Sequence, residues 1–202
     1  MNVPAVFFDK DGTLVEDVPY NADTDRVRLA TGAISCLHLL RAAGYKLFII
    51  SNQPGIELGL VSEADLIRVQ RKIEELSGVG FDGFYFCPHG AEDGGKSCGC
   101  RKPAPELLYR AAAEHHLALE KSWLVGDILN DVEAGRRAGM RTVFLDVGNE
   151  TEWKTGELRK PDFTAGDLVD AAYVILKESN IEQTARQDTF AADDFSRTNE
   201  PW

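Results

Sequence analysis

The chain has 202 residues, of which 44% are hydrophobic and 27% are charged, and this composition suits one globular domain with a sizeable core. Its 22 basic and 33 acidic residues give a formal net charge of −11, which argues against a protein that coats nucleic acid or an anionic membrane. An anionic small-molecule substrate stays compatible with this charge, because a divalent metal and a few basic side chains can make one pocket locally positive.

The N-terminal sequence has no basic region followed by a long apolar run, so we expect neither a signal peptide nor a membrane anchor. Three of the four cysteines, Cys87, Cys98 and Cys100, lie close to His89, whereas Cys36 lies alone in an apolar stretch. This layout favours metal binding in a reducing compartment over two disulfides. We therefore expect a cytoplasmic protein, most simply a monomer, with no nucleic-acid or membrane partner.

Short apolar runs alternate along the chain with amphipathic stretches of helical periodicity. Continuous apolar runs are typical of strands that are buried on both faces, and their alternation with helices predicts a mainly parallel sheet. The expected fold class is α/β, a Rossmann-like three-layer sandwich. In chain order, the predicted elements are strand 5–8, helix 31–43, strand 47–50, helix 62–76, strand 83–86, helix 105–116, strand 123–125, helix 131–138 and strand 142–145.

Two segments depart from this pattern. Residues 88–103 carry four glycines and cannot form a regular element, so something other than packing should hold them. The segment 181–202 contains five acids and two bases and lacks a sustained apolar face, which favours disorder. We therefore predict a domain at 1–180 followed by an acidic tail at 181–202.

Acidic residues follow two of the predicted strands directly. Asp9 and Asp11 come after the first strand, and Asp127 and Asp131 come after the fourth. Parallel strands would bring both groups to one edge of the sheet, where the carboxylates would repel one another unless a cation lay among them. Oxygen ligands of this kind suit magnesium. For Asp131, a role as a turn or helix-capping residue remains an equal alternative.

Four motifs in this order resemble those of the haloacid dehalogenase superfamily of phosphotransferases. Phe8-Asp9-Lys10-Asp11-Gly12-Thr13-Leu14 is similar to its DxDGT signature, and Ser51-Asn52-Gln53 is similar to its second motif. Lys102 resembles the motif-three lysine, and Gly126-Asp127 with Asp131 resembles the GDxxxD motif. The resemblance covers about residues 5–145, and the ordered set is a more specific signal than any one motif.

The resemblance implies a magnesium-dependent phosphatase, a phosphoric monoester hydrolase acting on a small phosphorylated substrate. Asp9 would be the nucleophile that forms an aspartyl-phosphate, and Asp11 would be the general acid and base. Asp9, Asp11 and Asp127 would hold Mg²⁺, and Asp131 would support it. Contacts to phosphate or substrate are implied for six residues: Thr13, Ser51, Asn52, Gln53, Arg101 and Lys102.

The segment 87–100 supplies three thiolates and one imidazole, from Cys87, His89, Cys98 and Cys100, a set that suits tetrahedral zinc. Four protein ligands would make the site structural, pinning the glycine-rich loop next to Arg101 and Lys102. A redox or incidental cysteine cluster is the alternative. Such a zinc loop, with no room for a large cap domain, resembles the subgroup of the superfamily that acts on heptose 1,7-bisphosphate or histidinol phosphate.

The chain departs from the heptose enzymes of that subgroup at two positions: Leu58, with the acid Glu57 beside it, stands where they have an Arg, and Ile128 stands where they have a Lys. The heptose bisphosphate remains the expected substrate, with histidinol phosphate as the alternative. We expect an open pocket, shaped by loops near 16–26 and 54–60 and by Arg101. A hypothesis of a different class is a non-catalytic zinc-bearing scaffold, whose tail aromatics Phe190, Phe195 and Trp202 would bind a partner.

Overall fold

The structure, a computed structural model, describes residues 2–90 and 98–179, so the predicted acidic tail at 181–202 lies outside the described residues. Within these ranges, six parallel strands form one sheet in the order β3-β2-β1-β4-β5-β6. This confirms the predicted α/β class. The strands are β1 (Ala5–Phe8), β2 (Lys46–Asn52), β3 (Gly83–Cys87), β4 (Trp123–Gly126), β5 (Arg141–Leu145) and β6 (Phe163–Ala165).

Each of the first four strands is connected to the next through an α-helix, as the alternation of apolar runs and amphipathic stretches predicts. Ser62 caps α2 reciprocally with Asp65: the Ser62 hydroxyl accepts the Asp65 N–H, and the Asp65 carboxylate accepts the Ser62 N–H. The helices are α1 (Ala33–Ala42), α2 (Glu63–Ser77), α3 (Glu106–His115) and α4 (Leu129–Arg137), with residues 168–179 also helical and short 3₁₀ turns at η1 (Thr24–Arg26), η2 (Leu119–Lys121) and η3 (Glu157–Arg159).

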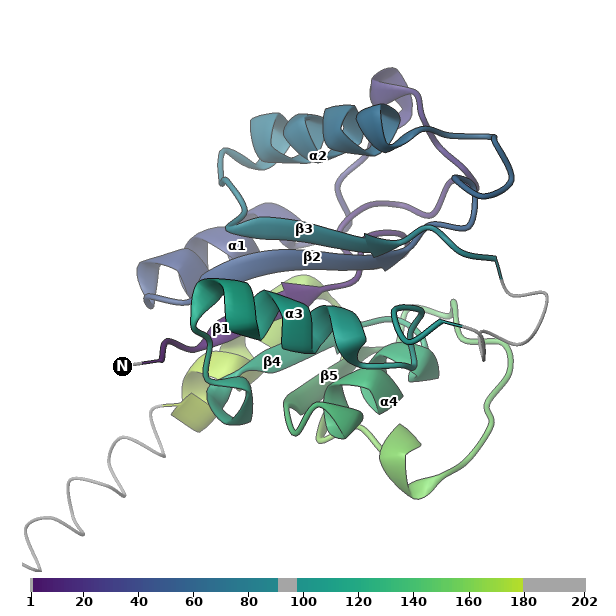
Figure 1. Cartoon of the computed structure of the whole chain (residues 1–202). Coiled ribbons are helices and arrows are strands. Elements are labelled where there is room, and N and C mark those ends of the chain that lie inside the picture. The colour runs from purple at the N-terminus through teal and green to yellow at the C-terminus, as the bar shows by residue number, and fades with distance from the viewer. Residues whose placement is uncertain (1, 91–97, 180–202) are drawn as a thin grey trace, which may run out of the picture.

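Side chains that alternate along the strands divide the core between the two faces of the sheet. In β1, Val6 and Phe8 belong to the cluster that packs against α1, α2 and helix 168–179. Ala5 and Phe7 belong to the cluster that packs against α3 and α4. Because neighbouring strand residues point to opposite faces, both faces need helices, which gives the three layers seen in Figure 1.

Two details of the fold differ from the sequence prediction. The strand β6 and helix 168–179 were not predicted. Three residues such as Phe163–Ala165 are too few to show a periodicity, whereas the buried Leu168, Ala171 and Ile175 have helical spacing that could have been recognised. In α1, helical spacing of Ile34, Leu37 and Leu40 underlies the predicted helix 31–43 and places all three on one face, yet Ile34 is 49% exposed. Ala33 and Cys36 complete the buried stripe instead, since 100° per residue places Ile34 beyond its edge.

The strand order fixes where a ligand can bind. From β1 the chain continues to β2 on one side, and the later strand β4 pairs with β1 on its other side. Loops that leave the carboxyl ends of these strands diverge around β1, and such a switch point is where open α/β sheets bind ligands. In the described residues, segment 9–32 between β1 and α1 contains only η1, so no large cap domain is inserted there. Across 2–90 and 98–179, every helix is too short or too polar to cross a lipid bilayer.

Candidate active site

The predicted acidic residues gather at the switch point. Asp9 directly follows β1, Asp127 directly follows β4, and Asp131 lies in the first turn of α4. All three are buried, and one carboxylate oxygen from each lies within 4.8 Å of the other two. The register of the sheet explains this, since Phe8 pairs with Val125 and the two strands therefore end side by side.

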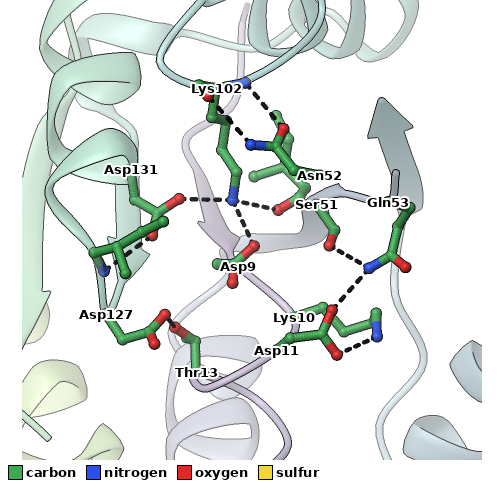
Figure 2. Close-up of polar contacts among 12 residues, drawn as sticks. Asp9, Lys10, Asp11, Thr13, Ser51, Asn52, Gln53, Lys102, Asp127 and Asp131 are labelled. Atoms are coloured by element: carbon green, nitrogen blue, oxygen red, sulfur yellow. Dashed lines mark hydrogen bonds and ion pairs between the residues drawn. The ribbon is translucent and has the colours of Figure 1, made fainter. Parts of the chain in front are cut away.

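A lysine from a distant segment enters this acidic group. The Lys102 Nζ lies 2.5 Å from Asp9 Oδ1 and 2.6 Å from Asp131 Oδ1, and it also donates to the Ile50 carbonyl at 3.1 Å. Figure 2 shows the ammonium between the two carboxylates, reaching down from the loop that precedes α3. Its side chain is 2% exposed, so the pairs are shielded from water.

Negative charge still exceeds positive charge in this group. If all three carboxylates are ionised, as metal binding requires, the one ammonium leaves two negative charges among Asp9, Asp127, Asp131 and Lys102. Burial raises the pKa of Asp9 to about 8 against the opposing effect of Lys102, with Asp131 and Asp127 adding to the rise. Burial would lower the pKa of Lys102, but Asp131 and Asp9 raise it above its ordinary value. A divalent cation beside these oxygens would balance the charge, so the donor set fits magnesium.

Asp127 differs from the other two carboxylates because neutral donors hold it. Its Oδ1 accepts the Thr13 hydroxyl at 2.8 Å, and its Oδ2 accepts the Asn149 side-chain amide at 2.8 Å. Burial, followed by the charge of Asp131, raises the pKa of Asp127, and the bonds from Asn149 and Thr13 oppose that rise. Thr13, predicted to contact phosphate, is fully buried and supports Asp127 here.

Asp11 lies outside the group formed by the other three carboxylates. Its Oδ1 is 2.5 Å from Lys10 Nζ, and its Oδ2 accepts the Gln53 amide at 2.7 Å. The same amide donates to Ser51 Oγ at 2.8 Å, as Figure 2 shows. Because that hydroxyl accepts from Gln53, its own proton is free to donate to a phosphoryl oxygen.

These side chains line a cavity of about 240 Å³. As predicted, Arg101 and a residue of the 16–26 loop, Asp17, contribute to the lining. Among the described residues, the loop 54–60 contributes nothing to it; instead Glu57 accepts the Gly90 N–H next to His89. The full lining is Asp9, Asp11, Asp17, Ser51, Asn52, Arg101, Lys102, Asp127, Ile128, Asn130 and Asn149.

The cysteine and histidine residues form a second cluster beside the cavity. The Cys87 Sγ lies 3.0 Å from Cys100 Sγ and 3.7 Å from Cys98 Sγ, and His89 Nδ1 lies 3.2 Å from Cys100 Sγ. Tetrahedral zinc with bonds near 2.3 Å would place sulfurs about 3.8 Å apart, so a modest expansion would admit the ion. Arg101 contacts the same loop, donating to the His89 carbonyl at 3.0 Å. The four residues could therefore hold one zinc ion.

Two residues of the site were not identified from the sequence. Lys10 is the variable position of its motif, so no role was expected for it, yet its side chain is buried and pairs with Asp11. Asn149 lies in the loop after β5, which carries no motif, and reaches Asp127 only because the chain folds back over the sheet edge. A buried lysine between two acids could have been suspected, but nothing in the sequence marks Asn149.

Comparisons with known proteins agree with this arrangement. Residues 99–171 match the HAD-hydrolase-like family. The chain is 32% identical over 163 residues to D-glycero-beta-D-manno-heptose-1,7-bisphosphate 7-phosphatase of Helicobacter pylori, a match that covers 79% of this chain and 92% of the relative. It is 37% identical over 151 residues to the protein of the same name from Pasteurella multocida, covering 71% and 82%.

A solved structure is similar as well. The crystal structure of D,D-heptose 1,7-bisphosphate phosphatase from B. bronchiseptica, complexed with magnesium and phosphate, superposes with a TM-score of 0.76 at 28% identity. The match covers 87% of this chain and 99% of that one. The fold and the acidic site thus define a phosphate-ester hydrolase. The chain belongs to the HAD-like hydrolase family, and as a phosphoric monoester hydrolase it is an enzyme and not a non-catalytic scaffold.

Proposed function

We propose that this protein hydrolyses the 7-phosphate of D-glycero-D-manno-heptose 1,7-bisphosphate, in carbohydrate metabolism, with Mg²⁺ as its catalytic cofactor. The observation that carries the proposal is the group of three buried carboxylates around Lys102, in a chain 31–37% identical to relatives that bear this enzyme's name. The site needs a divalent cation to balance its charge, and a phosphate ester is a substrate that such a site can activate.

Asp9 and Asp127 would hold the magnesium with the backbone carbonyl of Asp11, and Asp131 would support it while pairing with Lys102. Bound there, Mg²⁺ would screen the repulsion between the Asp9 carboxylate and the phosphate and take up charge in the transition state. Ser51 Oγ and the backbone N–H of Asn52 would hold the phosphoryl oxygens. Gln53 would act by orienting Ser51 and Asp11, because its amide donates to both.

The proposed reaction proceeds in two displacements. A carboxylate oxygen of Asp9 attacks phosphorus, the bond from phosphorus to the sugar oxygen breaks, and Asp11 gives that oxygen a proton. Asp11 then accepts a proton from water, which attacks the aspartyl-phosphate and breaks its bond to Asp9. Inorganic phosphate and the heptose 1-phosphate leave. Lys102 stays bonded to Asp9 and offsets the negative charge that gathers on the phosphoryl group.

Recognition of the remaining phosphate is assigned to Arg101. It lines the cavity, and among the described residues its guanidinium pairs with no carboxylate, which leaves donors for a phosphate. Leu58 and Ile128 provide no charge where the heptose enzymes have Arg and Lys. This departure favours histidinol phosphate, which has a single phosphate, as the second candidate substrate.

The proposal extends to the zinc site, the domain boundary, the oligomeric state and the partners. Zn²⁺ would be structural, held by Cys87, His89, Cys98 and Cys100, and the reduced thiols it requires are supplied by the cytoplasm. The phosphatase domain would comprise residues 1–180. We propose a monomer that binds a small phosphorylated sugar and neither nucleic acid nor a membrane surface.

A substrate panel tests the function. Phosphate release should be measured as kcat/KM for heptose 1,7-bisphosphate, fructose 1,6-bisphosphate and histidinol phosphate, with and without Mg²⁺. We expect the heptose substrate to be preferred at least tenfold and activity to require the metal. A preference for histidinol phosphate would assign the second candidate instead, and Mg²⁺-independent turnover would reject the mechanism.

A matched variant tests the role of Arg101. Arg101→Ala should raise KM for the heptose bisphosphate roughly tenfold or more, since a charge-assisted pair would be lost, while kcat changes less. Arg110→Ala is the control, because Arg110 lies on the exposed face of α3 and pairs with Glu114. An unchanged KM in Arg101→Ala would remove Arg101 from substrate recognition.

A further inference from the structure

Asn149 links the two acidic loops of the site. Its side-chain Nδ2 donates to Asp127 Oδ2 at 2.8 Å and lies 3.4 Å from the carbonyl oxygen of Gly12, in the loop after β1. Asp127 follows β4. One amide group therefore contacts both segments that carry the proposed magnesium ligands.

The hydrogen-bonding partners of Asp127 are uncharged, unlike the partner of Asp9 and Asp131. Asp9 and Asp131 share the ammonium of Lys102, whereas Asp127 forms no ion pair within the described part of the chain. The Thr13 hydroxyl and the Asn149 amide each occupy one of its carboxylate oxygens without bringing a positive charge. Each oxygen keeps a lone pair, and the carboxylate keeps its full charge for a cation.

The neighbour of Asn149 fixes its position. Glu150 Oε2 accepts the N–H of Leu129, the first residue of α4, at 2.6 Å, and Glu150 Oε1 accepts the N–H of Glu152 at 2.7 Å. This anchors the loop after β5 to the helix that carries Asp131. The backbone at Asn149 is thus anchored through the bonds of Glu150, although Asn149 itself is exposed.

Gly12 completes the close approach. Its φ of +81° suits glycine, and a Cβ at this position would lie 2.6 Å from Asn149 Nδ2 and would also collide with Asp127 Oδ2. The backbone after β1 can therefore pack directly against the pair of Asp127 and Asn149. The three residues form one interlocked contact at the edge of the cavity.

We propose that Asn149 is a positioning residue that orients the Asp127 carboxylate for a divalent cation and so sets the affinity of the site for Mg²⁺. The inference rests on the proposed function, because that function requires the cation. Asn149 takes no part in bond making. It holds one oxygen of Asp127 in place while Thr13 holds the other, and the lone pairs that remain on the two oxygens are left for the metal.

The test is calorimetric titration of Mg²⁺ into the full chain and into its Asn149→Ala variant. Loss of a partner that orients a metal ligand typically costs 10–100-fold in affinity, so we expect Kd for Mg²⁺ to rise at least about tenfold. The Tm without metal should stay near that of the wild type, because Asn149 is exposed. At saturating Mg²⁺, kcat should recover, and KM for the substrate should be unchanged.

Thr151→Ala is the matched control: Thr151 lies two residues along the same exposed loop, its side chain makes no hydrogen bond to the acidic residues within ranges 2–90 and 98–179, and its removal should leave Kd for Mg²⁺ unaltered. If the wild type binds Mg²⁺ and Asn149→Ala binds it equally tightly, the inference about Asn149 is overturned and the proposed function is not affected. A wild type that binds no Mg²⁺ would overturn the proposed function, and the inference with it. A kcat that stays low at saturating Mg²⁺ would also count against a role confined to metal affinity.

Discussion

The side chain of Asn52 and the backbone of Lys102 hold each other in both directions. Asn52 Oδ1 accepts the Lys102 N–H at 3.0 Å, and Asn52 Nδ2 donates to the Lys102 carbonyl at 3.2 Å. Asn52 ends β2, while Lys102 lies in the loop before α3. The two hydrogen bonds tie the backbone of Lys102 to the edge of the sheet. The fixed backbone in turn positions the side-chain ammonium that pairs with Asp9.

Asn52→Ala should therefore lower kcat by about 100-fold, because a displacement of Lys102 by roughly 1 Å misplaces a group that acts on the reacting atoms. The measurement is steady-state phosphate release with Tm recorded in parallel. Gln70→Ala is the control, since it removes an amide of the same kind that bonds Glu74 on α2. A kcat within twofold of the wild type would show that Lys102 does not depend on this clamp.

Asp9→Asn should abolish turnover, with a loss of about 10⁴-fold or more, because the amide keeps the shape of the carboxylate and loses the nucleophile. Mass spectrometry of acid-quenched protein should detect a phosphorylated wild type and no phosphorylated variant. Circular dichroism should show the same fold for both. Phosphorylation that persists in Asp9→Asn would move the nucleophile to another residue.

Gly12→Ala should weaken Mg²⁺ binding and reduce activity at least tenfold, because the added methyl collides with Asp127 and Asn149. Gly44→Ala is a close control: Gly44 has a φ of +88° but open space around its Cβ position. That variant should cost only about 1–2 kcal/mol of unfolding free energy, from the left-handed backbone, and keep its Mg²⁺ affinity. Equal Mg²⁺ affinities for the two variants would argue against the close approach at Gly12.

Cys98→Ser should remove the proposed zinc and lower both Tm and kcat, because the loop that carries Arg101 and Lys102 would lose its anchor. Elemental analysis should find one zinc per wild-type chain and much less in the variant. Cys36→Ala is the control. Cys36 is buried in α1, away from the cluster, so its removal should cost stability without changing the zinc content. Equal zinc in wild type and Cys98→Ser would exclude the four-ligand site.

Much of the fold was predictable from local patterns. The apolar runs at Ala5–Phe8 and Trp123–Gly126 are strands because both of their faces are buried, and such runs stand out in a sequence. The strand Phe163–Ala165 is too short to show a pattern, and it pairs only because β5 offers an open edge. Its existence depends on a neighbour that local sequence cannot specify.

The candidate site divides in the same way. By itself, the sequence determined which acids follow which strands and that Cys87, His89, Cys98 and Cys100 are a possible set of metal ligands, because these features are matters of residue type and short spacing. Only the tertiary structure decided that Lys102 lies between Asp9 and Asp131, that Asn52 clamps it, and that Asn149 holds Asp127. Those contacts join segments far apart in the chain, and their geometry exists only once the sheet has brought the loops to one edge.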